Sequence, residues 1–112
     1  MNITPCLSHV SLGSNDFEAA AAFYDRTLAA LFWLQVPIDG RPASPGNGTH
    51  VGFFATSKQQ VDEFHRQALL AGAADEGAPG SRPHYGEAYY GCFVRDLDGH
   101  KIEASFWDES AA

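Results

Sequence analysis

The sequence predicts a single α+β domain that contains two related strand–helix units. The first observation is an internal repeat, because a shift of the chain by 41 residues places His9 on His50 without a gap. The same shift also superposes apolar positions, namely Val10 on Val51, Leu12 on Phe53, Phe23 on Phe64 and Leu28 on Leu69. The second observation is that two or three strand-like segments follow the second helix. A repeat at a fixed offset determines the architecture, so we expect a pair of βαβββ modules over about residues 5–45 and 46–108.

Length and composition limit the classes of function. A chain of 112 residues builds one hydrophobic core. The net charge is −7 and no Lys/Arg-rich run is present, so nucleic acid is not an expected partner. The longest apolar window, residues 28–34, is too short to cross a bilayer, and residues 1–6 do not resemble a signal peptide. We therefore expect a cytoplasmic protein with no membrane partner, in which Cys6 and Cys92 are reduced thiols.

The first unit is predicted to be a strand over residues 7–12 and a helix over about residues 16–31. Strand side chains alternate between faces, so His9 lies on the face opposite Val10 and Leu12. Asn15 is the expected N-cap of the helix. Apolar residues recur at helical spacing and predict its buried stripe: Phe17, Ala20, Tyr24, Leu28 and Leu31.

The segment after this helix is too short to complete a module. The helix runs directly into a strand-like segment over residues 32–36, and residues 37–48 contain three prolines and three glycines and must form a loop. Only one strand fits where a complete module has three. Either two strands are absent, or a segment is omitted between Leu31 and Phe32; we favour omission, because this junction has no loop residues.

The second unit is predicted to be complete. A strand over residues 49–55 precedes a helix over 58–71, with Ser57 as N-cap and Gln60 three residues later. Residues 73–83 are rich in Gly and Pro and predict a loop with one short edge strand. Strands over 89–95 and 100–107 form a hairpin around the tight turn 96–99. In the last strand, Lys101, Glu103 and Ser105 share the face opposite Ile102, Ala104 and Phe106.

Two motifs resemble a known superfamily. The run Phe-Val-Arg-Asp-Leu-Asp-Gly-His-Lys-Ile-Glu at residues 93–103 resembles the closing hairpin of the vicinal oxygen chelate superfamily, which includes glyoxalase I, bleomycin-resistance proteins and extradiol dioxygenases. The run Ala-Phe-Tyr-Asp-Arg-Thr-Leu at residues 22–28 is similar to its first-helix motif. The resemblance covers the chain except residues 32–49 and implies a glyoxalase-like fold whose first module lacks two strands.

The resemblance also implies a metal site. The ligands of the superfamily lie on the first and last strands of each module, which correspond to His9, His50 and Glu103, with Gln35 as a weak ligand where glyoxalase I has a glutamate. Two imidazoles and a carboxylate suit Zn, Ni, Fe or Mn, and the metal is absent in some members. Glu103 is also the candidate catalytic residue. The neutral amide of Gln35 cannot act as a base, which argues against the standard glyoxalase I isomerisation.

Three functions stay open. The first is a lyase or isomerase in which the metal acts as a Lewis acid on a small substrate with vicinal oxygens. The second is an Fe(II) ring-cleaving dioxygenase. The third is a metal-free protein of the bleomycin-resistance type that sequesters a small molecule. His84, Tyr89 and Tyr90 are candidates for the substrate pocket. The resemblance further implies a homodimer that completes the cleft across two subunits, and we expect His65 on the surface and His100 in solvent.

Overall fold

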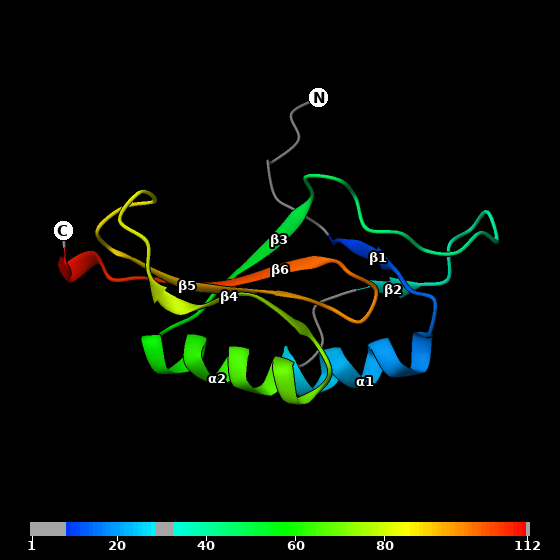
Figure 1. The fold of residues 1–112 in the computed structure, drawn as a ribbon, viewed down its shortest axis with the longest axis horizontal. Helices are drawn as coiled ribbons and strands as arrows, with labels where there is room; N and C mark the ends of the chain where they lie inside the picture. Colours follow the sequence, from blue (N-terminus) through cyan, green and yellow to red (C-terminus); the bar gives the residue numbers. More distant parts are fainter. Residues whose placement is uncertain (1–8, 29–32, 112) are drawn as a thin grey trace, which may run out of the picture.

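The computed structural model describes residues 9–28 and 33–111. These residues form two α-helices, α1 (Phe17–Thr27) and α2 (Lys58–Leu70), and six strands. Both helices lie on the same side of the strands, as Figure 1 shows. The strands are β1 (Ser11–Gly13), β2 (Trp33–Gln35), β3 (His50–Phe54), β4 (Ala74–Ser81), β5 (Tyr89–Arg95) and β6 (Lys101–Trp107), and the short 3-10 helix η1 (Glu109–Ala111) follows them.

The strand order confirms an α+β fold with one complete module and one short module. The larger sheet has the order β3-β6-β5-β4, in which β3 runs parallel to β6 and the other pairs are antiparallel. The smaller sheet contains β1 and β2, which are also parallel. These two strands therefore correspond to the first and last strands of a module. The junction between Leu31 and Phe32 lies outside the described residues.

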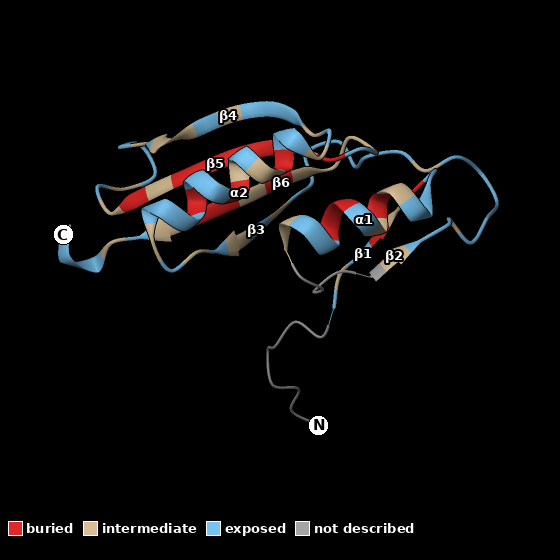
Figure 2. Cartoon of the chain, turned by 90° about the horizontal axis from the view of Figure 1, so that it is seen from below, coloured by how far each residue is buried: buried red, intermediate tan, exposed pale blue. Residues whose placement is uncertain are grey.

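The hydrophobic core lies between α2 and the larger sheet. The helix buries Val61, Phe64 and Ala68, and the sheet contributes Cys92, Val94, Ile102 and Ala104. Figure 2 shows this burial on β5, β6 and the sheet-facing side of α2. Alternation in this part of β6 follows the predicted pattern, because Ile102 and Ala104 are buried and Glu103, which lies between them, points to the other face. That other face carries the candidate functional site.

Several predicted boundaries differ in the structure. Asp16, not Asn15, is the N-cap of α1, and its carboxylate accepts a hydrogen bond from the Ala19 backbone N–H at 3.1 Å. Among the described residues, α1 ends at Thr27 and strand β1 begins only at Ser11. The segment predicted to hold one short edge strand forms the eight-residue strand β4. Its two register shifts against β5 explain why no alternating pattern indicates its length.

The two superfamily motifs contact each other at the junction of the modules. The Tyr24 hydroxyl of α1 donates a hydrogen bond to Asp96, in the turn between β5 and β6. Asp96 is 7% exposed and also accepts from the backbone N–H groups of Asp98 and His100, at 2.9 and 2.8 Å. Burial is the main reason that the pKa of Tyr24 is raised. This turn therefore joins module two to module one.

His100 and His65 are less solvated than expected. His100 Nε2 lies 2.8 Å from the Gly13 carbonyl oxygen, so this nitrogen must carry the proton and donate. His65 Nε2 lies 3.0 Å from Asp75 Oδ1, and the His65 side chain is only 12% exposed. Both imidazoles therefore make contacts within the fold, one between β1 and the hairpin turn and one between α2 and β4.

Cys92 is expected to be unreactive in the folded protein. Its side chain is 0% exposed, and burial raises the pKa of its thiol to about 11. Because the thiolate is the nucleophile, both factors slow reaction with a thiol reagent. In a Cys6→Ser background, we expect labelling by Ellman's reagent at pH 8 to be at least about 100-fold slower in buffer than in 8 M urea. Equal rates in the two solvents would contradict the buried position.

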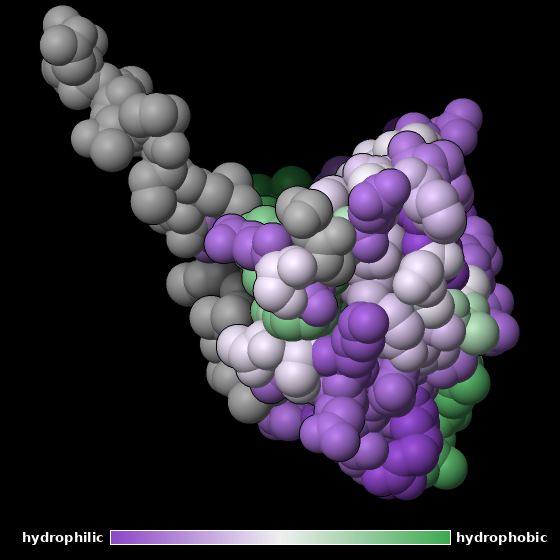
Figure 3. Space-filling model, turned by 90° about the vertical axis from the view of Figure 1, so that its left-hand side faces the viewer, coloured by the Kyte–Doolittle hydropathy of each residue, from purple (hydrophilic) through white to green (hydrophobic). Residues whose placement is uncertain are grey.

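One face of the molecule is mainly polar. Figure 3 views the molecule from the left-hand side of Figure 1 and shows mostly hydrophilic residues with small hydrophobic areas. This agrees with the net charge of −7. Within residues 9–28 and 33–111, neither helix is long and apolar enough to span a membrane.

Candidate functional site

A histidine and a carboxylate meet on the sheet face that points away from the helices. Strands β3 and β6 are adjacent and parallel, and Gly52 is the register partner of Glu103. His50 Nε2 lies 3.2 Å from Glu103 Oε1. The imidazole is 48% exposed, whereas the carboxylate side chain is 15% exposed. The glycine keeps this region open, because a Cβ at Gly52 would lie 3.3 Å from Glu103 Oε1.

The second carboxylate oxygen of Glu103 is held by a buried tyrosine. The Tyr89 hydroxyl donates to Glu103 Oε2 at 2.7 Å, and Tyr89 is 2% exposed. Burial, and next the hydrogen bond to Glu103, raise the pKa of Tyr89 well above its usual range. Tyr89 is therefore a permanent hydroxyl donor at neutral pH. Glu103 thus has a different partner on each oxygen.

An aromatic row borders this pair. The Tyr89 ring packs edge-to-face on Tyr85 and on Trp107, with centroid separations of 5.0 and 5.2 Å. His84 stacks in turn on Tyr85 at 4.3 Å. Edge-to-face contacts of this kind stabilise a rigid apolar wall. Tyr85 and Trp107 are 50% and 42% exposed, so this wall can contact a ligand.

An open cavity of about 790 Å³ lies beside Glu103. A volume of this size accommodates a small organic molecule. Its lining combines glutamates with aromatic rings and small residues: Gly52, Phe53, Phe54, Ala88, Glu103, Ser105, Trp107 and Glu109. Phe54 is 86% exposed. This open apolar surface together with carboxylates defines the candidate site.

Two of the predicted pocket residues, Tyr89 and Tyr90, lie on opposite faces of the larger sheet. Tyr89 and Tyr90 are consecutive, so they point to opposite faces. The Tyr90 hydroxyl donates to Asp62 of α2 at 2.6 Å, and Lys58 of α2 lies over the Tyr90 ring. The pocket assignment of Tyr90 is thus corrected, because its side chain lies on the helix side. His84 lies at the far end of the aromatic row.

The predicted ligands of module one are not gathered with His50 and Glu103. His9 is exposed and precedes β1. In residues 9–28 and 33–111, no three His, Cys, Asp or Glu side chains form a group that could hold a metal ion. The register also changes the position of Gln35. Ser11, which corresponds to Gly52 in the repeat, pairs with Trp33, so Trp33 and not Gln35 stands at the position equivalent to Glu103. Gln35 instead pairs with Gly13.

Several site residues carry weak signals in the sequence. Trp107 could not be placed from the sequence, and Gly52 and Gly91 carry no distinct signal, because single glycines are common in strands and loops. Tyr85, in contrast, stands beside His84 and is a candidate for the wall of the cleft from the sequence. The alternation of β5 and β6 was the usable signal. It places Tyr89, Gly91 and Phe93 on the face of Glu103 once the register between the two strands is known.

The fold is that of a vicinal oxygen chelate protein, and comparison with known proteins supports this class. A glyoxalase/bleomycin resistance protein from Albidiferax ferrireducens has a crystal structure that is 35% identical, with a TM-score of 0.80 over 89% of this chain and 97% of that chain. The chain therefore belongs to the glyoxalase/bleomycin resistance protein family, which confirms the resemblance. A glyoxalase-related enzyme from Fulvimarina pelagi shares the fold, with 21% identity and a TM-score of 0.72 over 92% of this chain and 88% of that chain.

A sequence relative is longer than this chain within the aligned region. An uncharacterised protein from Pseudomonas aeruginosa, PA2024, is 28% identical over 129 residues, which cover 93% of this chain and 90% of that protein. Because the chain has only 112 residues, the relative contains residues without a counterpart here. No family model matches the sequence.

Proposed function

We propose that this protein is a divalent-metal-dependent lyase or isomerase that acts on a small substrate with vicinal oxygens. The observation that carries the proposal is the pair of His50 Nε2 and Glu103 Oε1, 3.2 Å apart on adjacent strands beside an open cavity. An imidazole and a carboxylate are ligands for Zn, Ni, Fe or Mn. A bound metal would act as a Lewis acid on a developing enolate or oxyanion.

Among the described residues, two of the predicted ligands lie together. His50 and Glu103 provide one nitrogen and one oxygen donor, and Gly52 leaves space beside the carboxylate. His9 is the predicted third ligand, but it does not join this group within the chain. A homodimer would complete the site if His9 of a second copy approached the open face. We expect a dimer in sedimentation at micromolar concentration, and a monomer there would contradict this arrangement.

A lysine lies on the same sheet face as His50 and Glu103 and could interact with an anionic oxygen of a substrate. Lys101 is the register partner of His50, and its amine lies 4.9 Å from the centroid of the Phe93 ring on the same face. A fixed cation near a developing oxyanion stabilises it without reorganisation. Glu103, held by Tyr89, would keep its carboxylate aimed at the same region. These residues would therefore bind and orient an oxygenated substrate.

The proposal is tested by metal content. We expect about one metal ion per chain by mass spectrometry in untagged protein purified without chelator, or after addition of Zn, Ni, Mn or anaerobic Fe(II). His50→Ala and Glu103→Gln should lose this metal. The matched control is His65→Ala, because His65 lies on α2 and pairs with Asp75 instead. Absence of metal in wild-type protein after reconstitution would overturn the metalloenzyme.

A second candidate is a metal-free binding protein. The observation that favours it is the exposed apolar surface at the cavity, where Phe54 is 86% and Trp107 is 42% exposed. Contiguous exposed aromatic side chains mark ligand or protein contacts. Tight binding of a small aromatic ligand that persists in EDTA and is lost in Trp107→Ala would support this function. Oxygen uptake with Fe(II) and a catechol would instead favour a dioxygenase.

A further inference from the structure

We propose that Tyr89 is a positioning residue that holds Glu103 in its pairing geometry with His50, and that Gly91 is required for Tyr89 to do so. This inference deepens the proposed function, because it concerns how the candidate metal carboxylate is oriented. It separates Tyr89 from the substrate pocket to which the sequence assigned it. The proposal stands on contacts among β5, β6 and the loop between β4 and β5.

The first step is that the two carboxylate oxygens of Glu103 have different partners. Oε1 lies 3.2 Å from His50 Nε2, and Oε2 accepts from the Tyr89 hydroxyl at 2.7 Å. A carboxylate with one donor on each oxygen is restricted in rotation about its last side-chain bond. Without the tyrosine hydroxyl, one oxygen would lose its protein donor. The hydroxyl therefore selects the orientation in which Oε1 points to His50.

The second step is that Tyr89 acts through Glu103 and not on a ligand. Its 2% exposure leaves almost no surface for substrate contact. Tyr85 and Trp107 pack on its ring, and Trp107 also approaches Gly86 in the loop after β4. These contacts fix the ring, so its hydroxyl has one position. A donor held in this way provides a geometric constraint at low entropic cost.

The third step is the glycine beneath the ring. A Cβ at Gly91 would lie 2.2 Å from the Tyr89 hydroxyl oxygen and 2.5 Å from the ring carbon that bears it. These distances are far below van der Waals contact, so the tyrosine lies across the strand only because residue 91 has no side chain. The register partner in β4, Gly80, differs, because a Cβ there would have no atom within 4 Å.

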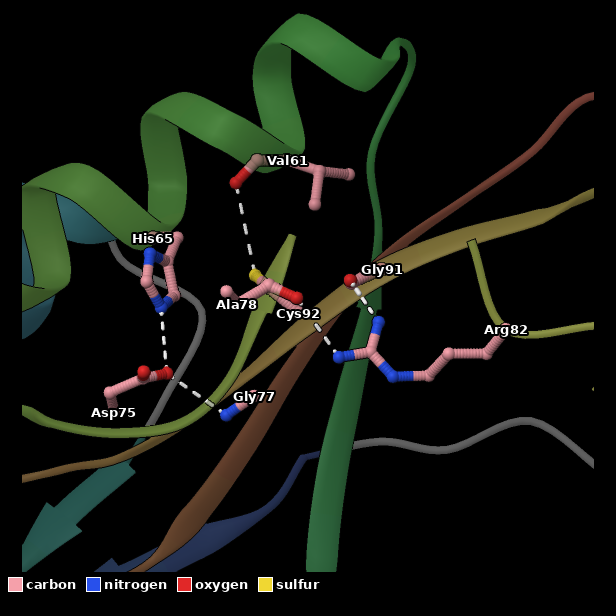
Figure 4. A network of polar contacts seen from close by, with 8 residues as sticks. All are labelled: Val61, His65, Asp75, Gly77, Ala78, Arg82, Gly91 and Cys92. Carbon is pink, nitrogen blue, oxygen red and sulfur yellow. Dashed lines mark hydrogen bonds and ion pairs between the residues drawn. The ribbon is translucent and has the colours of Figure 1, made fainter. Parts of the chain in front are cut away.

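The fourth step is an anchor for the backbone at this position. The Arg82 guanidinium donates from Nη1 to the Gly91 carbonyl oxygen at 2.5 Å and from Nη2 to the Ala78 carbonyl oxygen at 2.9 Å, as Figure 4 shows. It also donates to the Gly80 carbonyl oxygen. Arg82 thus satisfies carbonyl groups where the β4–β5 register shifts. Arg82 therefore links the backbone of β5 at Gly91 to the backbone of the neighbouring strand β4.

The decisive experiment compares two adjacent tyrosines. Crystal structures of wild-type, Tyr89→Phe and Tyr90→Phe protein report the position of the Glu103 carboxylate, and calorimetric titration with Zn²⁺ reports affinity. In Tyr89→Phe we expect the carboxylate to leave its position beside His50 and the Kd for Zn²⁺ to rise about 10- to 100-fold. Tyr90→Phe removes a hydroxyl on the opposite face and should change neither.

Two glycine variants test the support of the ring. Gly91→Ala should displace Tyr89 and reproduce the effect of Tyr89→Phe on Glu103, whereas Gly80→Ala should not. Thermal unfolding of each variant separates positioning from loss of fold. Tyr89→Phe keeps the ring, so its melting temperature should remain close to that of Tyr90→Phe.

The possible outcomes separate the two proposals. An unmoved Glu103 carboxylate in Tyr89→Phe overturns the positioning role. A displaced carboxylate with a Kd for Zn²⁺ within twofold of wild type overturns it as well, because the orientation would then have no consequence. If wild-type protein binds no Zn²⁺, Ni²⁺, Mn²⁺ or Fe²⁺, the proposed function fails, and the carboxylate position alone decides the role of Tyr89.

Discussion

Replacement of Asp96 by alanine is expected to destabilise the protein by at least about 3 kcal/mol. Asp96 is 7% exposed and accepts from three donors, namely the Tyr24 hydroxyl and the backbone N–H groups of Asp98 and His100. A buried donor left without an acceptor costs about 1–3 kcal/mol. The Tyr24 hydroxyl is such a donor, and the two backbone N–H groups, which are partly buried, add to this loss. The hydrogen bonds that would be lost lie at the junction of the two modules. Urea unfolding followed by circular dichroism measures it.

The neighbouring carboxylate is the matched control. Asp98 lies in the same turn and accepts an exposed hydrogen bond from the Asn15 backbone N–H at 2.9 Å. Asp98→Ala should therefore cost no more than about 1 kcal/mol. Tyr24→Phe should lie between the two, and a double-mutant cycle of Tyr24 and Asp96 should show coupling. Equal costs for Asp96→Ala and Asp98→Ala would refute the role given to Asp96.

The second large effect is expected in the core of module two. Ile102 is 0% exposed and belongs to the cluster between α2 and the larger sheet. Ile102→Ala should destabilise the protein by about 2–5 kcal/mol, because it removes buried methyl groups and leaves a cavity. Chemical denaturation measures the change. If this variant does not fold, Ile102→Val should still fold, with a cost of about 0.5–1.5 kcal/mol.

Module one should respond more weakly. Leu34 lies in β2 and is only partly buried against the same core. Its sheet has two strands, so fewer groups surround it than surround Ile102. Leu34→Ala is therefore expected to cost about 1 kcal/mol. A cost as large as that of Ile102→Ala would mean that the short module carries as much of the core as the complete one.

Much of the complete module could be predicted from the sequence. The helix spacing of Val61, Phe64 and Ala68 and the alternation of β6 are local patterns, and both are present. Ser57 accepts from the Gln60 backbone N–H at 3.0 Å, as its capping position predicts. The family resemblance implied that His50 and Glu103 belong to one site, and the structure places them on neighbouring strands. The metal set that includes His9 and Gln35 stays a prediction.

Tertiary structure alone decided the surroundings of that pair. Two consecutive tyrosines cannot be distinguished by composition, and the register of β5 against β6 determined that Tyr89 and not Tyr90 reaches Glu103. His100 and Gly13 are 87 residues apart, and Tyr24 and Asp96 are 72 apart, yet each pair is hydrogen-bonded. Periodicity and capping depend on a few neighbouring residues, so the sequence by itself determined the elements. Contacts between distant residues depend on how these elements pack, and no local pattern contains that information.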